Sequence, residues 1–215
     1  MRFVLEASPA EIRVLGCLIE KQRTTPDAYP LSLNALRLAC NQTTNRDPVV
    51  EYDDATVRAA AQRLGRRGWT RFASGPGSRA PKYRHMLGEA LHLADDELAL
   101  LCVLMLRGPQ TPGELKARTE RLHAFPDLPT LEATLAGLVD RELVSRLERR
   151  PGQKEQRYRQ LLGGESAAAE EQGLPERSVA ADAPDVTLDG RVARLEEELG
   201  ALRAAVEELR SELGA

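Results

Sequence analysis

The feature that most constrains the fold of this 215-residue chain is an internal duplication within its first 164 residues. A helix-start signal, Ser8-Pro9-Ala10-Glu11, precedes an apolar stripe, and Ala94-Asp95-Asp96-Glu97 precedes a similar stripe 86 residues later. A Ser at a helix cap and a Glu three residues on satisfy two backbone N–H groups. The same offset carries Thr25-Pro26 onto Thr111-Pro112. The first helix of each copy and the approach to the second are therefore expected to match.

The later parts of the two copies match at offsets of 74 and 75 residues. Apolar residues spaced for one helix face are Val57, Ala61 and Leu64, and again Leu131, Leu135 and Leu138. A strand-like run, a Pro-Gly turn and a second strand follow in each copy: 69–74, Pro76-Gly77 and Lys82-Tyr83-Arg84, then 143–147, Pro151-Gly152 and Arg157-Tyr158-Arg159. Because the offset changes only where loops are expected, the pattern indicates a tandem duplication.

Three helices followed by a two-stranded hairpin are typical of a winged helix, whose third helix commonly enters the DNA major groove. The sequence therefore predicts a mainly α fold with small β-hairpins. It comprises two tandem winged-helix domains, a disordered linker and a C-terminal coiled-coil helix. The predicted boundaries are 1–88 for the first domain, 89–164 for the second, 165–186 for the linker and 187–215 for the coil.

The C-terminal prediction depends on a change in pattern after residue 164. Residues 165–186 have an acidic bias and no apolar period, so they cannot bury enough apolar surface to offset their ordering entropy. Apolar residues then recur at alternating steps of four and three, which favours a parallel coiled coil that pairs two chains. These residues are Leu188, Val192, Leu195, Leu199, Leu202, Val206, Leu209 and Leu213. The alternative is a single amphipathic helix that folds back on its own domain.

Several long motifs in the two copies resemble the YceH family of bacterial proteins. The motifs are 19–22 (IEKQ), 29–34 (YPLSLN), 39–49 (ACNQTTNRDPV), 106–115 (LRGPQTPGEL) and 150–158 (RPGQKEQRY). The resemblance covers about residues 9–164. It implies paired winged-helix domains, and it supplies neither an activity nor catalytic residues.

Charge is distributed unevenly along the chain. The whole sequence has a formal net charge of −3, which argues against a strongly basic nucleic-acid binder. Residues 1–86 nevertheless carry a net charge of +6, residues 87–164 carry −1, and residues 165–215 carry −8. The argument against DNA binding therefore does not apply to the first copy.

Basic residues in the first copy are placed where a winged helix contacts DNA. The outer face of the predicted third helix carries Arg58, Gln62, Arg63 and Arg66, and the hairpin adds Arg79, Lys82 and Arg84. Arginine can pair with guanine and glutamine with adenine, and both can bind phosphate. The alternative is a solvated face in an arginine-rich chain. In the loop before the third helix, polar side chains are expected to cap helix ends, or to meet phosphate through Arg46.

The second copy differs at the positions that match this helix face. It carries Glu132, Ala136, Gly137 and Asp140, which would repel phosphate and leave the face available to a protein partner. Its hairpin is basic, however, and is predicted to make phosphate contacts. The residues concerned are Arg149, Arg150, Lys154, Arg157 and Arg159.

Residues that could support catalysis are few. Cys17, Cys40 and Cys102 lie in apolar runs, which predicts buried, reduced thiols in a cytoplasmic protein. The three histidines are scattered, and no metal-ligand or nucleophile motif occurs. The longest apolar run, 98–106, is about half of a membrane span. We therefore expect neither an enzyme nor a cofactor, a metal or a membrane partner.

These observations favour a regulatory, double-stranded-DNA-binding homodimer. The competing hypothesis is a non-enzymatic protein-interaction scaffold built from the same paired winged helices.

Overall fold

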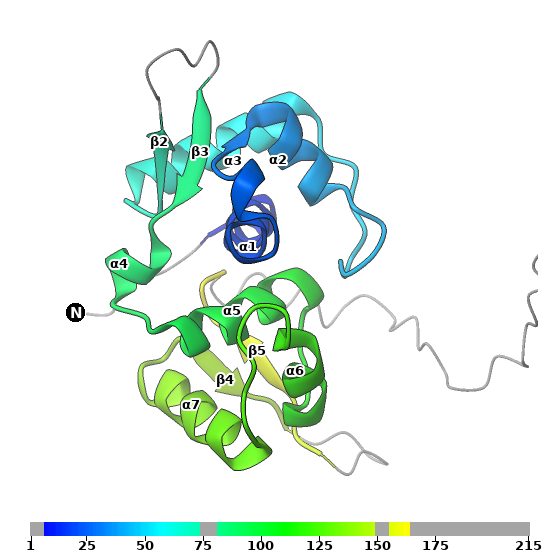
Figure 1. The fold of residues 1–215 in the computed structure, drawn as a ribbon, viewed down its shortest axis with the longest axis vertical. Coiled ribbons are helices and arrows are strands. Elements are labelled where there is room, and N and C mark those ends of the chain that lie inside the picture. The colour runs from blue at the N-terminus through cyan, green and yellow to red at the C-terminus, as the bar shows by residue number, and fades with distance from the viewer. Residues whose placement is uncertain (1–6, 74–80, 149–154, 164–215) are drawn as a thin grey trace, which may run out of the picture. The chain divides into compact units, whose positions relative to one another are not determined.

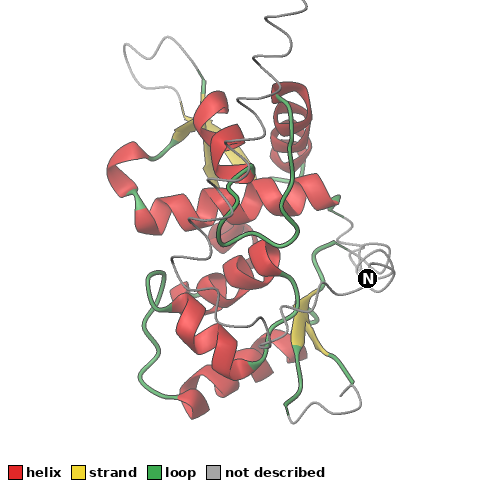
Figure 2. Cartoon of the chain, turned by 90° about the vertical axis from the view of Figure 1, so that its right-hand side faces the viewer, coloured by secondary structure: helices red, strands yellow, loops and turns green. Residues whose placement is uncertain are grey.

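The computed structural model describes residues 7–73, 81–148 and 155–163, all within the first of two compact units of the chain. In this part the protein is mainly helical with two small antiparallel sheets, as the sequence predicted (Figures 1 and 2). The predicted linker 165–186 and the coil 187–215, with all eight heptad positions, lie outside the described residues.

The elements of the first copy follow the predicted order. They are α1 (Pro9–Thr24), the 3-10 helix η1 (Pro26–Ala28), β1 (Leu31–Ser32), α2 (Leu33–Cys40), α3 (Asp54–Arg66), β2 (Thr70–Ala73) and β3 (Lys82–His85). A short helix, α4 (Leu87–Leu91), crosses the predicted boundary between the copies. The second copy contains α5 (Asp95–Arg107), α6 (Pro112–Thr119), α7 (Leu128–Asp140), β4 (Val144–Arg146) and β5 (Tyr158–Gln160).

Side-chain caps determine where several of these helices begin. Ser8 and Glu11 form the predicted capping box at α1. Asp53 accepts a hydrogen bond from the backbone N–H of Thr56 at 2.8 Å, and Asp127 accepts the matching bond from Thr130 at 2.8 Å. The first and last residues of α7 lie 74 positions after the first and last residues of α3, which is the predicted offset. The two third helices therefore start and end at equivalent positions.

The two sheets are similar, although the first has three strands and the second has two. In the first, β3 lies between β1 and β2, and Tyr83 pairs with both Leu31 and Phe72. In the second, β5 pairs with β4, and Tyr158 forms an isolated bridge with Gln110, just before α6. Tyr83 and Tyr158, which the duplication matches, thus hold the same place in their sheets.

The two copies pack together where α1 contacts α5. Gly16 allows this approach, because a Cβ atom at that position would lie 2.9 Å from two side-chain atoms of Leu106 and 3.3 Å from the Cβ of Met105. The Cys102 thiol donates to the Gly16 carbonyl at 3.4 Å. Cys17, Cys40 and Cys102 are buried and free, as predicted for these thiols.

We expect Gly16→Val to lower the free energy of unfolding by about 1–3 kcal/mol, because overpacking forces neighbouring side chains from their positions. Leu106 is only 4% exposed, so it has little room to yield. Denaturant unfolding of the full chain measures the loss.

Gly137→Ala is the matched control, since a Cβ atom there meets nothing within 4 Å. It lies inside α7 and should raise stability by about 0.5–1 kcal/mol through helix propensity. Equal stabilities for Gly16→Val and the wild type would contradict close packing at this contact.

Candidate nucleic-acid interface

Helix α3 presents a polar, basic face to solvent because its opposite face is buried. Val57, Ala60, Ala61 and Leu64 lie in the core. Arg58, Gln62 and Arg66 are exposed, and Arg63 is half-buried. These four polar side chains therefore lie on the outer face of the helix, where the sequence pattern predicted them.

Arg63 differs from its neighbours because it has an internal partner. Its Nε lies 3.4 Å from Oε1 of Glu11, whose side chain is only 3% exposed, and Nε of Arg67 lies 3.9 Å from the same oxygen. The Arg67 guanidinium also lies 5.8 Å from the centre of the Trp69 ring. Arg63 and Arg67 therefore link the C-terminal part of α3 to α1 through ion pairs, and Arg58, Gln62 and Arg66 remain the outward-facing polar set.

The hairpin of β2 and β3 adds further basic side chains. Tyr83 and His85 are buried, while Lys82 on the alternate face is exposed and Arg84 is half-buried. Arg71 pairs with Arg84 across the hairpin and is exposed. Arg84 contacts Glu89 at 3.4 Å. Sequence reasoning did not select Arg71, although strand alternation places it beside Arg84.

An exposed aromatic ring lies at the edge of the same hairpin. Phe72 is 53% exposed and packs against Tyr83 at 5.1 Å between ring centres. Burial raises the pKa of Tyr83, and the positive charge of Arg58 opposes that rise. Arg58 of α3 is therefore close enough to Tyr83 of β3 for its charge to act on that side chain. The basic face of α3 and the hairpin are thus neighbouring parts of one surface. Phe72 was a second residue that sequence reasoning did not select.

Arg46 does not belong to this surface, which corrects the expectation that it meets phosphate. Its side chain is fully buried, and its guanidinium donates to both carboxylate oxygens of Glu20, at 3.0 and 2.6 Å. It also donates to the Ala39 carbonyl at 3.1 Å and to the Gln42 side chain at 2.8 Å.

Hydrogen bonds within the loop of residues 41–53, and from the loop to α5, hold it in place. The Asn41 side chain exchanges two hydrogen bonds with the backbone of Tyr52, at 2.8 and 2.9 Å. The backbone N–H of Asp47 donates to the Leu106 carbonyl of α5 at 2.8 Å. The loop thereby connects α2, α3 and the second copy.

The matching face of α7 has the opposite character. Glu132, Ala136 and Asp140 are exposed, and Gly137 is half-buried. Leu128, at the start of the helix, is 38% exposed. This acidic and partly apolar face has no equivalent of the three outward polar side chains of α3.

Two basic residues in the described part of the second hairpin form hydrogen bonds within the second copy. Arg159 donates to the Ser145 hydroxyl at 3.0 Å, and Arg157 donates to the Pro109 carbonyl at 2.5 Å. Four other predicted contact residues, Arg79, Arg149, Arg150 and Lys154, lie outside the described residues.

The described residues contain no group of three or more side chains that could hold a metal ion. None of the helices in this part of the chain is long and apolar enough to cross a bilayer.

The fold and this surface define a mainly helical protein with two small sheets and one arginine-rich helix face. The chain belongs to a family described as "Protein of unknown function, DUF480", whose model matches residues 7–153. It is 50% identical over 205 residues to a UPF0502 protein of Pelobacter propionicus, covering 93% of this chain and 91% of the relative. A UPF0502 protein of Geotalea daltonii is 52% identical over 190 residues, covering 87% and 86%. One of Solibacter usitatus is 48% identical over 201 residues, covering 94% and 95%.

Proposed function

We propose that this chain is a regulatory protein of tandem winged-helix architecture that binds double-stranded DNA through its first copy. Helix α3 enters the major groove, and the β2–β3 hairpin lies along the adjacent backbone. The observation that carries the proposal is the contrast between matched helices. Arg58, Gln62 and Arg66 face outward on α3, where α7 has acidic and small residues.

The outward side chains of α3 have the chemistry that base readout requires. Arginine donates two parallel hydrogen bonds to guanine, and glutamine pairs with adenine in the same bidentate manner. Arg37 of α2 pairs with Asp54 at the start of α3 at 2.8 Å. This ion pair links α2 to the start of α3, the two helices that a helix-turn-helix places on DNA.

The hairpin supports the proposal through phosphate contacts. Arg71 and Lys82 are exposed on β2 and β3, on the face of the hairpin that also carries Arg84. Phosphate contacts set the position of a protein on the duplex and supply much of its affinity.

The second copy has a smaller role in this proposal. Its third helix avoids DNA, and its hairpin adds phosphate contacts only. The heptad repeat of residues 187–215 pairs two chains, so that the DNA site is roughly palindromic. The motifs that resemble the YceH family agree with the paired winged helices.

A protein-interaction scaffold is the second candidate. It is favoured by the α7 face, where Leu128 is exposed beside Glu132 and Asp140 carries a further acidic charge. Under this alternative, a basic protein partner covers α7 and the α3 face is merely solvated.

We expect Arg58→Glu combined with Arg66→Glu to weaken binding to random duplex DNA about 10- to 100-fold, because two attractive contacts become repulsive. The original arginines are exposed, so thermal unfolding should hardly change. Arg63 is left intact because it contacts buried Glu11. Fluorescence anisotropy with a labelled duplex at low salt measures the effect.

Lys116→Glu combined with Arg121→Glu is the matched control. It changes the net charge by the same amount in the second copy, away from α3. A wild-type affinity in the α3 variant, or an equal loss in both variants, would contradict groove binding by this face.

A further inference from the structure

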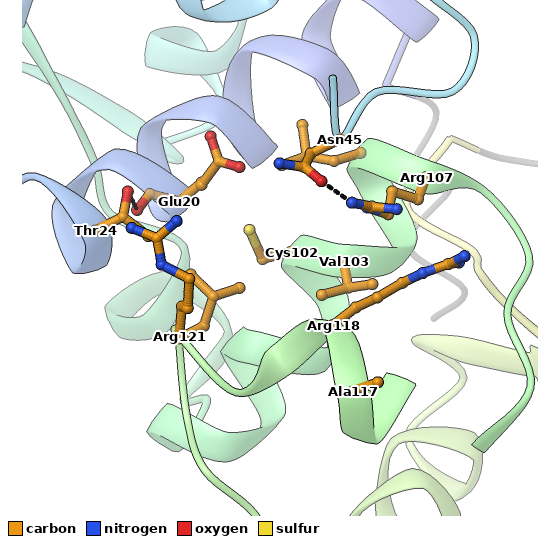
Figure 3. Close-up of a pocket in the computed structure, with 11 residues that line it drawn as sticks. Glu20, Thr24, Asn45, Cys102, Val103, Arg107, Ala117, Arg118 and Arg121 are labelled. Carbon is orange, nitrogen blue, oxygen red and sulfur yellow. Dashed lines mark hydrogen bonds between the residues drawn. The ribbon is translucent and has the colours of Figure 1, made fainter. Parts of the chain in front are cut away.

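A pocket of about 230 Å³ lies between the two copies, outside the proposed DNA surface. From the first copy it is lined by Glu20 and Thr24 of α1 and, across from them, by Asn45 of the 41–53 loop, which accepts a hydrogen bond from Arg107 (Figure 3). The other lining residues belong to α5, to α6 and to the segment that follows α6. Cys102, Val103 and Leu106 give the pocket an apolar part.

Three arginines of the second copy line this pocket. Arg121 lies on the side of Glu20 and Thr24, and Arg107 and Arg118 lie opposite, with the Cys102 sulfur between the two groups (Figure 3). Burial lowers the pKa of Arg107, and the positive charges of Arg118 and Arg46 lower it further. Arg107 is thus partly shielded from water and close enough to Arg118 and Arg46 to be repelled by them, although it donates a hydrogen bond to Asn45, while Arg121 adds an exposed positive charge across the pocket.

The nearby carboxylates leave this charge incompletely balanced. Glu20 lines the pocket, but its oxygens accept from Arg46 at 3.0 and 2.6 Å, and Lys21 lies at 3.2 Å. Burial would raise the pKa of Glu20, but the hydrogen bonds from Arg46 outweigh burial and lower it. Glu114 contacts Arg118 at 3.4 Å from a partly exposed position, and Asp47 acts on Arg107 at longer range.

We propose that this pocket binds a small dianion that carries a phosphoryl group or two carboxylates. Guanidinium groups bind such oxyanions through paired hydrogen bonds. A short carbon chain of the ligand would lie against the apolar part of the pocket. The pocket volume is below the usual range of sites that bind drug-sized ligands, so the ligand is small. Because both copies line the pocket, the ligand would also tie them together. This inference does not depend on DNA binding.

Calorimetric titration of the full chain with inorganic phosphate and, separately, with succinate tests the proposal, with the ionic strength held constant. Arg121→Gln removes one exposed charge, and Ala117→Phe fills the pocket while keeping all three arginines. Each variant should weaken binding of the preferred anion by about tenfold or more, which is about 1.4 kcal/mol. Arg66→Gln on α3 should bind it as the wild type does.

The two anions distinguish the sources of the ligand. Tighter binding of phosphate identifies a phosphoryl ligand, and tighter binding of succinate identifies a dicarboxylate. Binding of neither anion overturns the proposal. So does wild-type affinity in Ala117→Phe, or a loss confined to Arg66→Gln, since the anion would then bind elsewhere.

Discussion

Replacing Arg46 with alanine should lower the free energy of unfolding by about 3–5 kcal/mol, because the substitution leaves a largely buried carboxylate without its main partner. The Glu20 side chain is 15% exposed and accepts two hydrogen bonds from Arg46. The hydrogen bonds to the Ala39 carbonyl and the Gln42 side chain are lost as well. Chemical denaturation of the full chain measures this loss.

Two further variants test whether the loss of stability comes from the buried ion pair or from the removal of any arginine charge. Arg23→Ala removes a more exposed pair with Asp95 and should cost at most about 1 kcal/mol. Glu20→Met combined with Arg46→Met removes both charges and should be less destabilised than Arg46→Ala, since no unpaired charge stays behind. If Arg46→Ala proved as mild as Arg23→Ala, the buried ion pair could not be a main support of the 41–53 loop.

The second large effect concerns pH and depends on His85. Burial lowers the pKa of this imidazole from its usual 6.5 to about 4, and the charges of Arg84 and Arg23 act in the same direction. Nε2 contacts the side-chain oxygen of Gln22, and the buried Nδ1 has no hydrogen-bond partner among the described residues. Protonation would therefore place an unpaired N–H and a positive charge in the core.

The folded state thus resists a proton that the unfolded chain accepts. Below pH 6.5 the unfolded chain gains the proton first, so stability should fall as pH drops toward the folded pKa of about 4. Between about pH 7 and about pH 4.5 the His85 contribution amounts to about 2–3 kcal/mol.

The measurement is denaturant unfolding at both pH values for the wild type and His85→Gln. The variant should lose about 2–3 kcal/mol less stability on acidification, because glutamine does not titrate. His92→Asn serves as the control: His92 is exposed with a φ of 49°, which asparagine tolerates. If His85→Gln kept the wild-type pH dependence, the buried imidazole would not be its source.

Much of the fold follows from local patterns in the sequence. The spacing of Val57, Ala61 and Leu64 predicts the buried face of α3, and the 74-residue offset transfers that helix to α7. The same periodicity correctly assigned Arg58, Gln62 and Arg66 to the outer face. These predictions succeed because helix period and caps are properties of neighbouring residues.

Features that depend on distant residues could not be predicted in this way. Arg46 has the sequence context of a surface loop residue, and its ion pair with Glu20, 26 positions earlier, could not be read from that context. The contact of Arg63 with Glu11 and the close approach at Gly16 likewise arise from tertiary packing. Arg71 could have been found, because alternation places it on the same face of the hairpin as Lys82 and Arg84.

The salt dependence of binding to a labelled random duplex tests the central claim most directly. Arg71 and Lys82 of the hairpin are exposed, and in two paired chains they can together neutralise roughly four phosphates, each contact releasing counterions. For the full chain, a plot of log affinity against log salt concentration should therefore fall with a slope of about −3 to −4. Absence of binding at about 50 mM salt, or an affinity that does not change with salt, would contradict DNA binding by the first copy.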